Sequence, residues 1–187
     1  MLRAQAGDRQ AIASLIERHH RDMFLYFSRL AGNRGLAEEL TQECFLRLVR
    51  GVARYSPPRP VRPWLYAVAA NLWRDHLRRA ARRREVAAAA AGTGPLDPSP
   101  SVEDQVTRRL LADRLSAAVR ALPPETAQAL VLRFCHNLRV REIAEILGTR
   151  EGTVKSRLFY GLRRLRVMLE SEEVAAHGQA TPASPRG

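Results

Sequence analysis

Basic, hydroxyl and aromatic side chains suited to reading DNA are concentrated between positions 150 and 163 of this sequence. Arginine and lysine bind phosphates and the acceptor edge of guanine, and serine and threonine hydroxyls bond to either group. This chemistry is binding rather than catalysis. The candidate residues are Arg150, Thr153, Lys155, Ser156, Arg157, Phe159, Tyr160 and Arg163.

The spacing of residues 140–158 is typical of a helix-turn-helix motif. Ala144 is small where two helices must cross closely, and Gly148 stands in the turn, where a positive φ is needed. The basic run then lies on or near the outward side of the second helix, as in a recognition helix. An ordinary helical hairpin with a solvated basic face is the alternative interpretation. The apolar residues that would join the two helices are Ile143, Leu147, Val154 and Leu158.

A second candidate site lies upstream, where aromatic and amide side chains stand beside a run of arginines. Trp64, Asn71 and Asp75 are spaced 7 and 4 residues apart, which places them on one stripe of a helix. Aromatic rings stack on unpaired bases and amides bond to base edges, so the stripe is suited to single-stranded DNA. A tryptophan on an amphipathic helix is more often a core residue, which is the competing interpretation. The candidate residues are Trp64, Asn71, Trp73, Arg74, Asp75 and Arg78.

One acidic and apolar surface interrupts the first basic part of the chain. Its polar residues project away from an apolar stripe with four-residue spacing, and Phe45 and Leu46 accompany them. Such a mixed surface is typical of a protein-docking face, and a solvated helix face is the alternative. The polar residues of this face are Glu38, Glu39, Gln42, Glu43 and Arg47.

The hydrophobic pattern predicts an all-α protein of two small helical domains, because no segment alternates with period 2. The domains are expected over residues 1–84 and 105–170, joined by a flexible linker over 85–104 and followed by a disordered tail over 171–187. Asp8 is the expected N-cap of the first helix, and Pro63 suits a first helical turn. Helices are predicted over residues 8–31, 35–52, 62–84, 102–121, 125–136, 140–147 and 151–169.

The charge of the chain favours a polyanionic partner. The net charge is +12, and residues 1–80 and 105–170 each carry +7. Surplus positive charge on folded parts attracts nucleic acid, since each neutralised phosphate releases condensed counterions. Arginine-rich codon usage is the alternative explanation.

Composition argues against several other classes of protein. No apolar run approaches the ~20 residues of a membrane span, and the N-terminus lacks the apolar core of a signal peptide, so a cytoplasmic protein is expected. Cys44 and Cys135 show no metal-binding spacing, so neither a metal nor a cofactor is expected. Paired carboxylates with metal spacing, H-x-E and P-loop signatures are missing, which predicts a non-enzyme with no small-molecule substrate.

Taken together, the chain resembles an extracytoplasmic-function (ECF, group 4) sigma factor, the minimal two-domain class of bacterial transcription initiation factors. Residues 37–47 resemble region 2.2, residues 62–77 resemble regions 2.3–2.4, and residues 142–166 resemble region 4. The resemblance implies that the protein binds core RNA polymerase and directs it to specific promoters. The helix-turn-helix would read the −35 element and the N-terminal domain would melt the −10 element. The implied partners are the β′ clamp helices and β flap of polymerase, promoter DNA and an anti-sigma factor.

The resemblance also implies roles for single residues. Asn71 matches the residue that lines the flipped-base pocket, and Trp64 matches a core tryptophan. Tyr160 stands where an arginine is common, and Cys44 replaces an aliphatic residue, which favours a core thiol over a redox sensor. The implied polymerase contacts are Leu40, Gln42, Glu43, Phe45 and Arg47.

A stand-alone helix-turn-helix regulator that does not bind polymerase is the alternative function. It would explain residues 140–166 but would leave the glutamate-rich face and the Trp64–Asn71 stripe without a role. Such regulators usually form dimers on palindromic DNA, and no dimerisation heptad is visible here.

Overall fold

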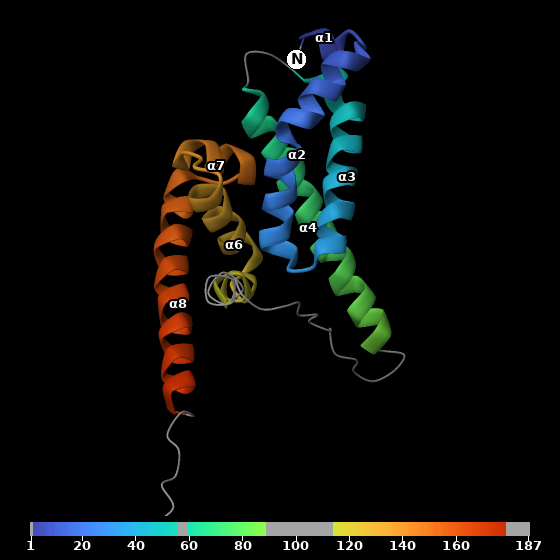
Figure 1. Cartoon of the computed structure of the whole chain (residues 1–187). Helices are drawn as coiled ribbons and strands as arrows, with labels where there is room; N and C mark the ends of the chain where they lie inside the picture. Colours follow the sequence, from blue (N-terminus) through green and yellow to red (C-terminus); the bar gives the residue numbers. More distant parts are fainter. Residues whose placement is uncertain (1, 56–59, 89–113, 179–187) are drawn as a thin grey trace, which may run out of the picture.

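The protein is all-α. The computed structural model describes residues 2–55, 60–88 and 114–178, and these contain helices and turns but no strand. Figure 1 shows two groups of helices side by side, with α8 at the outer edge of one group and α3 at the outer edge of the other. The helices are α1 (Leu2–Gln5), α2 (Arg9–Ala31), α3 (Arg34–Gly51), η1 (Val52–Arg54), α4 (Val61–Ala88), a helical stretch over 114–120, α6 (Pro124–Leu130), η2 (Val131–Cys135), α7 (Val140–Leu147) and α8 (Glu151–Gly178).

Local sequence signals determine where α2 begins and ends and where α3 begins. The carboxylate of Asp8 accepts a hydrogen bond from the Ala11 amide at 3.0 Å, so Asp8 is the expected N-cap of α2. Gly32 ends α2 with a φ of 66°, and its N–H donates to the Ser28 carbonyl. Asn33 then caps α3 by accepting from the Leu36 amide at 2.9 Å. A sharp reversal between two long helices follows from these short-range bonds.

Two helices are longer than the sequence predicts. The long helix α4 continues to Ala88, so residues 85–88 belong to it and not to the expected linker. Likewise α8 continues to Gly178, so residues 171–178 are helical and not a disordered tail. Alanine and glutamate are strong helix formers, and the Ser171 hydroxyl also donates to the Val167 carbonyl at 2.8 Å. The rest of the expected linker and tail, residues 89–104 and 179–187, lies outside the described residues.

The core is continuous across both halves of the chain. The apolar stripe of α3 is buried as predicted, with Leu40, Cys44 and Leu48 at most 4% exposed. The same cluster of buried side chains includes Leu132 and Ile143 from the second half. Helix α4 packs on α7, and α2 packs on η2. The sequence predicted two domains but not their packing against each other.

The helix-turn-helix motif has the predicted geometry. Gly148 ends α7 with a φ of 63°, as the turn requires. Ile143 and Val154 are fully buried between the two helices, and Leu147 is 8% exposed. Further along the same face, α8 lies against α6, where Gly161 is buried.

The close approach of α8 to α6 depends on Gly161. A Cβ at this position would lie 2.7 Å from Thr126 Cγ2 and 3.0 Å from Leu130 Cδ1. We therefore predict that Gly161→Ala lowers the free energy of unfolding by about 1–3 kcal/mol, the usual effect of overpacking, measured by urea denaturation. Gly152→Ala is the matched control on the same helix, because a Cβ there would meet nothing within 4 Å. Equal stability of the two variants would contradict the proposed close contact.

Candidate nucleic-acid interface

The outward face of α8 presents most of the residues predicted to read DNA. Arg150 and the candidates from Thr153 to Arg163 are exposed, except Arg157. The rings of Phe159 and Tyr160 are 62% and 64% exposed and stack edge to face, with their centroids 5.2 Å apart. Contact with bases or sugars removes the apolar surface of such rings from water, which is favourable. Phe159 and Tyr160 therefore add apolar contact to a basic face.

Arg157 differs from its neighbours on α8. Its guanidinium is half-buried and forms an ion pair with the Glu125 carboxylate of α6. This pair ties the recognition helix α8 to α6 and engages Arg157 Nη2, a donor that a phosphate would otherwise bind. Arg157 is therefore held against the protein in this arrangement, whereas Lys155 and Arg163 are exposed.

Asn71 is the exposed amide of the α4 stripe. Its Oδ1 accepts a hydrogen bond from Arg74 Nη2 at 2.5 Å, which orients the exposed Asn71 side chain and leaves its NH₂ group available as a donor. An amide held in this way can donate to an acceptor on a base edge. Trp64 is half-buried, and its ring packs edge to face on Tyr55 at 5.3 Å, as expected of a core tryptophan with one accessible side.

Trp73 is not a DNA contact in this structure, which corrects the sequence prediction. The side chain is 7% exposed, belongs to the core and stacks on His76 with ring centroids 5.6 Å apart. The physical reason is helical periodicity, because two residues along a helix turn the side chain about 200° away from Asn71. Proximity in sequence to Asn71 misled the prediction.

An ion-pair network joins α3 to α4. Arg47 Nη1 donates to Asp75 Oδ2 at 3.0 Å, and Arg47 Nε donates to Glu43 Oε1 at 2.9 Å. Asp75 Oδ1 also accepts from Arg78 Nη2 at 2.5 Å. The bonds from Arg47 and Arg78 hold the pKa of Asp75 below its usual range, and the bond to Glu43, followed by that to Asp75, raises the pKa of Arg47. The sequence placed Arg47 and Asp75 on two different binding surfaces, but the fold pairs them.

The candidate docking face on α3 is smaller and more apolar than predicted. Leu40 and Phe45 are 4% and 6% exposed and pack in the core, so neither is an available contact, which corrects the prediction. Gln42 is exposed, and Leu46 and Val49 beside it are 51% and 40% exposed. These two residues are absent from the polymerase contacts implied by the resemblance. Their spacing of four and seven residues from Gln42 could have identified them, since such residues share a helix face.

The Cys44 thiol of α3 is buried. Burial raises the pKa of the Cys44 thiol to about 12, so this thiol is inert. Within residues 2–55, 60–88 and 114–178, no three histidine, cysteine or acidic side chains gather to hold a metal ion. The described helices also include none that is long and apolar enough to cross a membrane.

An exposed basic helix-turn-helix, a second basic helix with an outward amide and an exposed apolar docking face define a helical DNA-binding protein with a protein partner. The family models agree with this class: residues 15–83 match Sigma-70 region 2, and residues 112–165 match Sigma-70 region 4. The chain belongs to the family of ECF RNA polymerase sigma factors, and it is a sigma factor that directs RNA polymerase to promoters.

Three curated relatives are of this family. The chain is 37% identical over 185 residues to ECF RNA polymerase sigma factor SigE of Mycolicibacterium smegmatis, covering 95% of this chain and 68% of the relative. The chain is 33% identical over 179 residues to RNA polymerase sigma factor CarQ of Myxococcus xanthus, covering 93% of this chain and 98% of the relative. For ECF sigma factor BldN of Streptomyces coelicolor it is 32% over 172 residues, and this chain spans 64% of that protein's length.

Two solved structures share the fold. The sigma factor RpoE from Bartonella quintana, in complex with the anti-sigma factor NepR, superposes with a TM-score of 0.70 at 16% identity, covering 86% of this chain and 98% of that chain. CnrH in complex with the cytosolic domain of CnrY gives a TM-score of 0.67 at 20% identity, covering 91% of this chain and 94% of that chain. Identities this low support the fold alone.

The Arg47–Asp75 pair has a pH-dependent contribution to stability. Because the folded-state pKa of Asp75 is lowered, the pair stabilises the protein above the unfolded pKa near 4 and is lost as pH falls through the folded pKa. We predict that Asp75→Asn lowers the unfolding free energy at pH 7 by about 0.5–1 kcal/mol, as for other partly exposed pairs. The difference in unfolding free energy between this variant and the wild type should shrink in acid. Urea denaturation at pH 7 and at acidic pH measures it. Glu17→Gln removes a carboxylate at an exposed site of α2 and is the matched control. A pH-independent Asp75 effect would argue against the ion pair.

Proposed function

We propose that this chain is a group 4 ECF sigma factor and that its two halves divide promoter recognition between them. Residues 1–84 would bind core polymerase and open the −10 element, and residues 105–170 would read the −35 element through α8. The observation that supports this division is the presence of two separate DNA-suited faces, the exposed basic surface of α8 and the oriented Asn71 of α4. The proposed −35 contacts are Arg150, Thr153, Lys155, Ser156, Phe159, Tyr160 and Arg163, with Arg157 joining them once it leaves Glu125.

The proposed −10 contacts lie on α4. Asn71 would bond to a base that leaves the stack, Trp64 would support the pocket, and Arg74 would keep the Asn71 amide oriented. Arg78 would contact phosphate, and Asp75 would position Arg78 rather than touch DNA. A base taken out of the duplex must be held by such contacts, since unstacking costs a few kcal/mol.

The proposed polymerase surface is the exposed face of α3. Gln42 and Glu43 supply polar contacts, and Leu46 and Val49 supply the apolar centre that a docking site needs. Arg47 would hold Glu43 in position rather than contact polymerase, because it bonds to both Glu43 and Asp75. The β′ clamp is the proposed partner of α3 and the β flap that of the second half. We also propose a cytoplasmic protein without catalytic activity that an anti-sigma factor holds inactive; the structurally similar sigma factor RpoE forms a complex with the anti-sigma factor NepR.

Run-off transcription with purified core polymerase tests this function, and the exposed leucine of α3 provides a specific variant. Leu46→Asp should lower the affinity for core polymerase about tenfold or more, because it places a charge in the centre of an apolar contact. Leu25→Asp on α2 is the matched control, since Leu25 is also exposed, at 38%. A stand-alone regulator would bind promoter duplex without polymerase, and Leu46→Asp would leave that binding unchanged. That result would favour the alternative function.

Asn71 provides a test of the melting step. Asn71→Asp keeps the shape of the side chain but removes the amide donor, so open-complex formation on a duplex promoter should fall about tenfold or more, the discrimination expected of a good base contact. Binding to a template already melted at the −10 element should fall less. Arg79→Ala, an exposed arginine two turns further along α4, should weaken both templates about equally. Equal losses for Asn71→Asp on both templates would indicate a structural role for Asn71 only.

A further inference from the structure

A small polar cavity lies where α4, α6 and the turn of the helix-turn-helix meet. Its volume is about 210 Å³, and we call it the polar cavity. Two half-buried arginines, Arg74 of α4 and Arg157 of α8, line it, and Glu125 is the acidic side chain among its described lining residues. Two guanidiniums on one small cavity are typical of a site for an anion. The other lining residues are Gln128, Leu147, Gly148 and Thr149.

Arg74 carries a charge that no carboxylate of the described residues neutralises. Its Nε donates to the Ala70 carbonyl at 3.4 Å, and its Nη2 donates to Asn71 Oδ1 at 2.5 Å. Both acceptors are neutral, whereas Arg157 pairs with the Glu125 carboxylate. A half-buried charge is only partly hydrated, so an anion gains more from it than from an exposed arginine. Arg74 therefore gives the polar cavity its net positive charge.

A buried amide on the same cavity has a donor to spare. Gln128 is fully buried, and its Oε1 accepts from the Tyr26 hydroxyl at 3.0 Å, which fixes the direction of the amide. Its Nε2 has no hydrogen-bond partner among the described residues. A buried donor without a partner is costly, and an oxygen of a bound anion would satisfy it. This unpartnered donor is independent of the two arginines and indicates the same kind of ligand.

A larger and more apolar cavity adjoins the polar cavity. Its volume is about 450 Å³, and Arg74 and Glu125 line both cavities. We call it the wide cavity; its size is within the roughly 300–1,000 Å³ usual for small-molecule sites. Asn71 lines it with its NH₂ group available, and such a donor beside apolar walls suits a nucleobase, whose edge carries acceptors. The apolar residues of the wide cavity are Leu77, Pro123 and Pro124.

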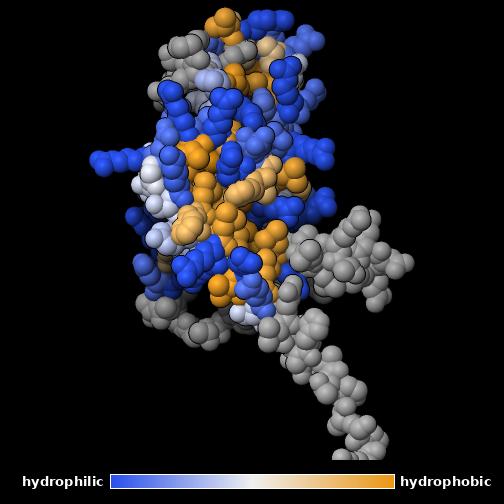
Figure 2. All heavy atoms as spheres, turned by 90° about the vertical axis from the view of Figure 1, so that its left-hand side faces the viewer, coloured by the Kyte–Doolittle hydropathy of each residue, from blue (hydrophilic) through white to orange (hydrophobic). Residues whose placement is uncertain are grey.

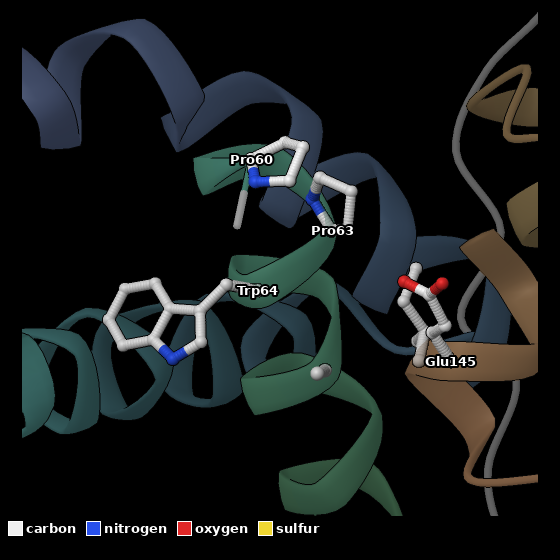
Figure 3. A pocket seen from close by; sticks show the side chains of 6 residues that line it. Pro60, Pro63, Trp64 and Glu145 are labelled. Carbon is white, nitrogen blue, oxygen red and sulfur yellow. The ribbon is translucent and has the colours of Figure 1, made fainter. Parts of the chain in front are cut away.

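Another cavity, between α4 and α7, has the opposite charge. Its volume is about 540 Å³, and Glu145 is the charged side chain among its described lining residues. Figure 3 shows Glu145 on α7, across this cavity from Pro63 of α4. A carboxylate repels a phosphate, so size alone does not select the place for an anion. The arginines select the polar cavity.

We propose that the polar cavity and the wide cavity together form a site for a free nucleoside phosphate. The terminal phosphate binds Arg74, Arg157 and Gln128 Nε2, and the base binds Asn71 in the wide cavity. A volume of about 210 Å³ is too small for a phosphate with a sugar on each side, so the ligand is a free nucleotide rather than a DNA strand. Because Asn71 is also the proposed −10 contact, a bound nucleotide competes with promoter DNA. This competition rests on the proposed function, but the site itself does not.

Isothermal titration calorimetry of the full chain tests the site without reference to transcription. The probes are inorganic phosphate, ribose-5-phosphate and the monophosphates AMP, GMP, CMP and UMP. The tightest of these monophosphates should bind about tenfold or more tightly than ribose-5-phosphate, because its base adds a hydrogen bond and apolar contact in the wide cavity. Monophosphates that bind no more tightly than ribose-5-phosphate, or do not bind, would overturn the proposal.

Arginine variants test the position of the phosphate. Arg74→Gln and Arg157→Gln should each weaken the binding of the tightest monophosphate about tenfold or more, since each removes a charge-assisted hydrogen bond. Arg79→Gln is the matched control, because Arg79 is an exposed arginine of α4 outside the lining of both cavities. It should change the affinity less than twofold. Equal losses in the three variants, with circular dichroism unchanged, would indicate general attraction of charge and overturn the site.

A single-stranded DNA oligonucleotide without terminal phosphates distinguishes a free nucleotide from a DNA strand. No binding of the oligonucleotide, or binding that Arg157→Gln leaves unchanged, supports a site for a terminal phosphate. Binding that Arg157→Gln weakens as much as it weakens the monophosphate would assign the polar cavity to DNA and overturn the proposal. Loss of the proposed −10 role of Asn71, with monophosphate binding intact, would instead count against the proposed function and leave the nucleotide site supported.

Discussion

The position of α4 is the constraint on which the rest of the structure depends. One side of this helix supplies Leu65, Tyr66 and Leu72 to the core, and another side pairs with Arg47 of α3 through Asp75. The stripe that carries Asp75 also presents Asn71, and α4 packs on α7. A helix has only about 3.6 residues per turn, so each of these sides is limited to a few positions. A shift of α4 by one residue would disturb the core, the ion pair and the DNA-suited amide together.

Arginine has two different roles in this protein. Exposed residues such as Arg150 and Arg163 provide charge that a phosphate can neutralise, whereas Arg47, Arg62 and Arg157 bond to other helices. Partly exposed ion pairs contribute little stability, since water and salt screen them. Their fixed geometry matters more, because the planar guanidinium sets the separation and orientation of the two helices it joins. This use of arginine explains how so basic a chain can still be compact.

The surfaces of the two halves differ in what they leave exposed. The second half keeps Phe134, Phe159, Leu162 and Val167 accessible, and Figure 2 shows apolar atoms gathered along the middle of the face that α8 belongs to, with hydrophilic atoms around them. Scattered apolar residues are normal on a protein surface, but a gathered set indicates contact with other molecules. The first half exposes the aliphatic residues Leu2, Leu25, Leu46 and Val49, and the last two lie beside the polar residues of α3.

The sequence by itself determined the helices, their caps and the helix-turn-helix. Asp8, Gly32, Asn33 and Gly148 act through bonds or φ angles within a few residues, so the structure could be inferred at these positions from neighbours alone. The exposed face of α8 was predictable for the same reason, because helical periodicity relates its residues to each other.

Only the tertiary structure decided which residues meet across helices. Leu40, Phe45 and Trp73 were predicted as contacts and are buried, while Arg47 and Asp75 were assigned to separate surfaces and are bonded. The pairs Tyr26–Gln128 and Tyr66–His136 are 102 and 70 residues apart, and no local pattern relates their members. Periodicity states which residues share a face of one helix. It does not state which face another helix covers, because that depends on the sum of all packing energies in the folded chain.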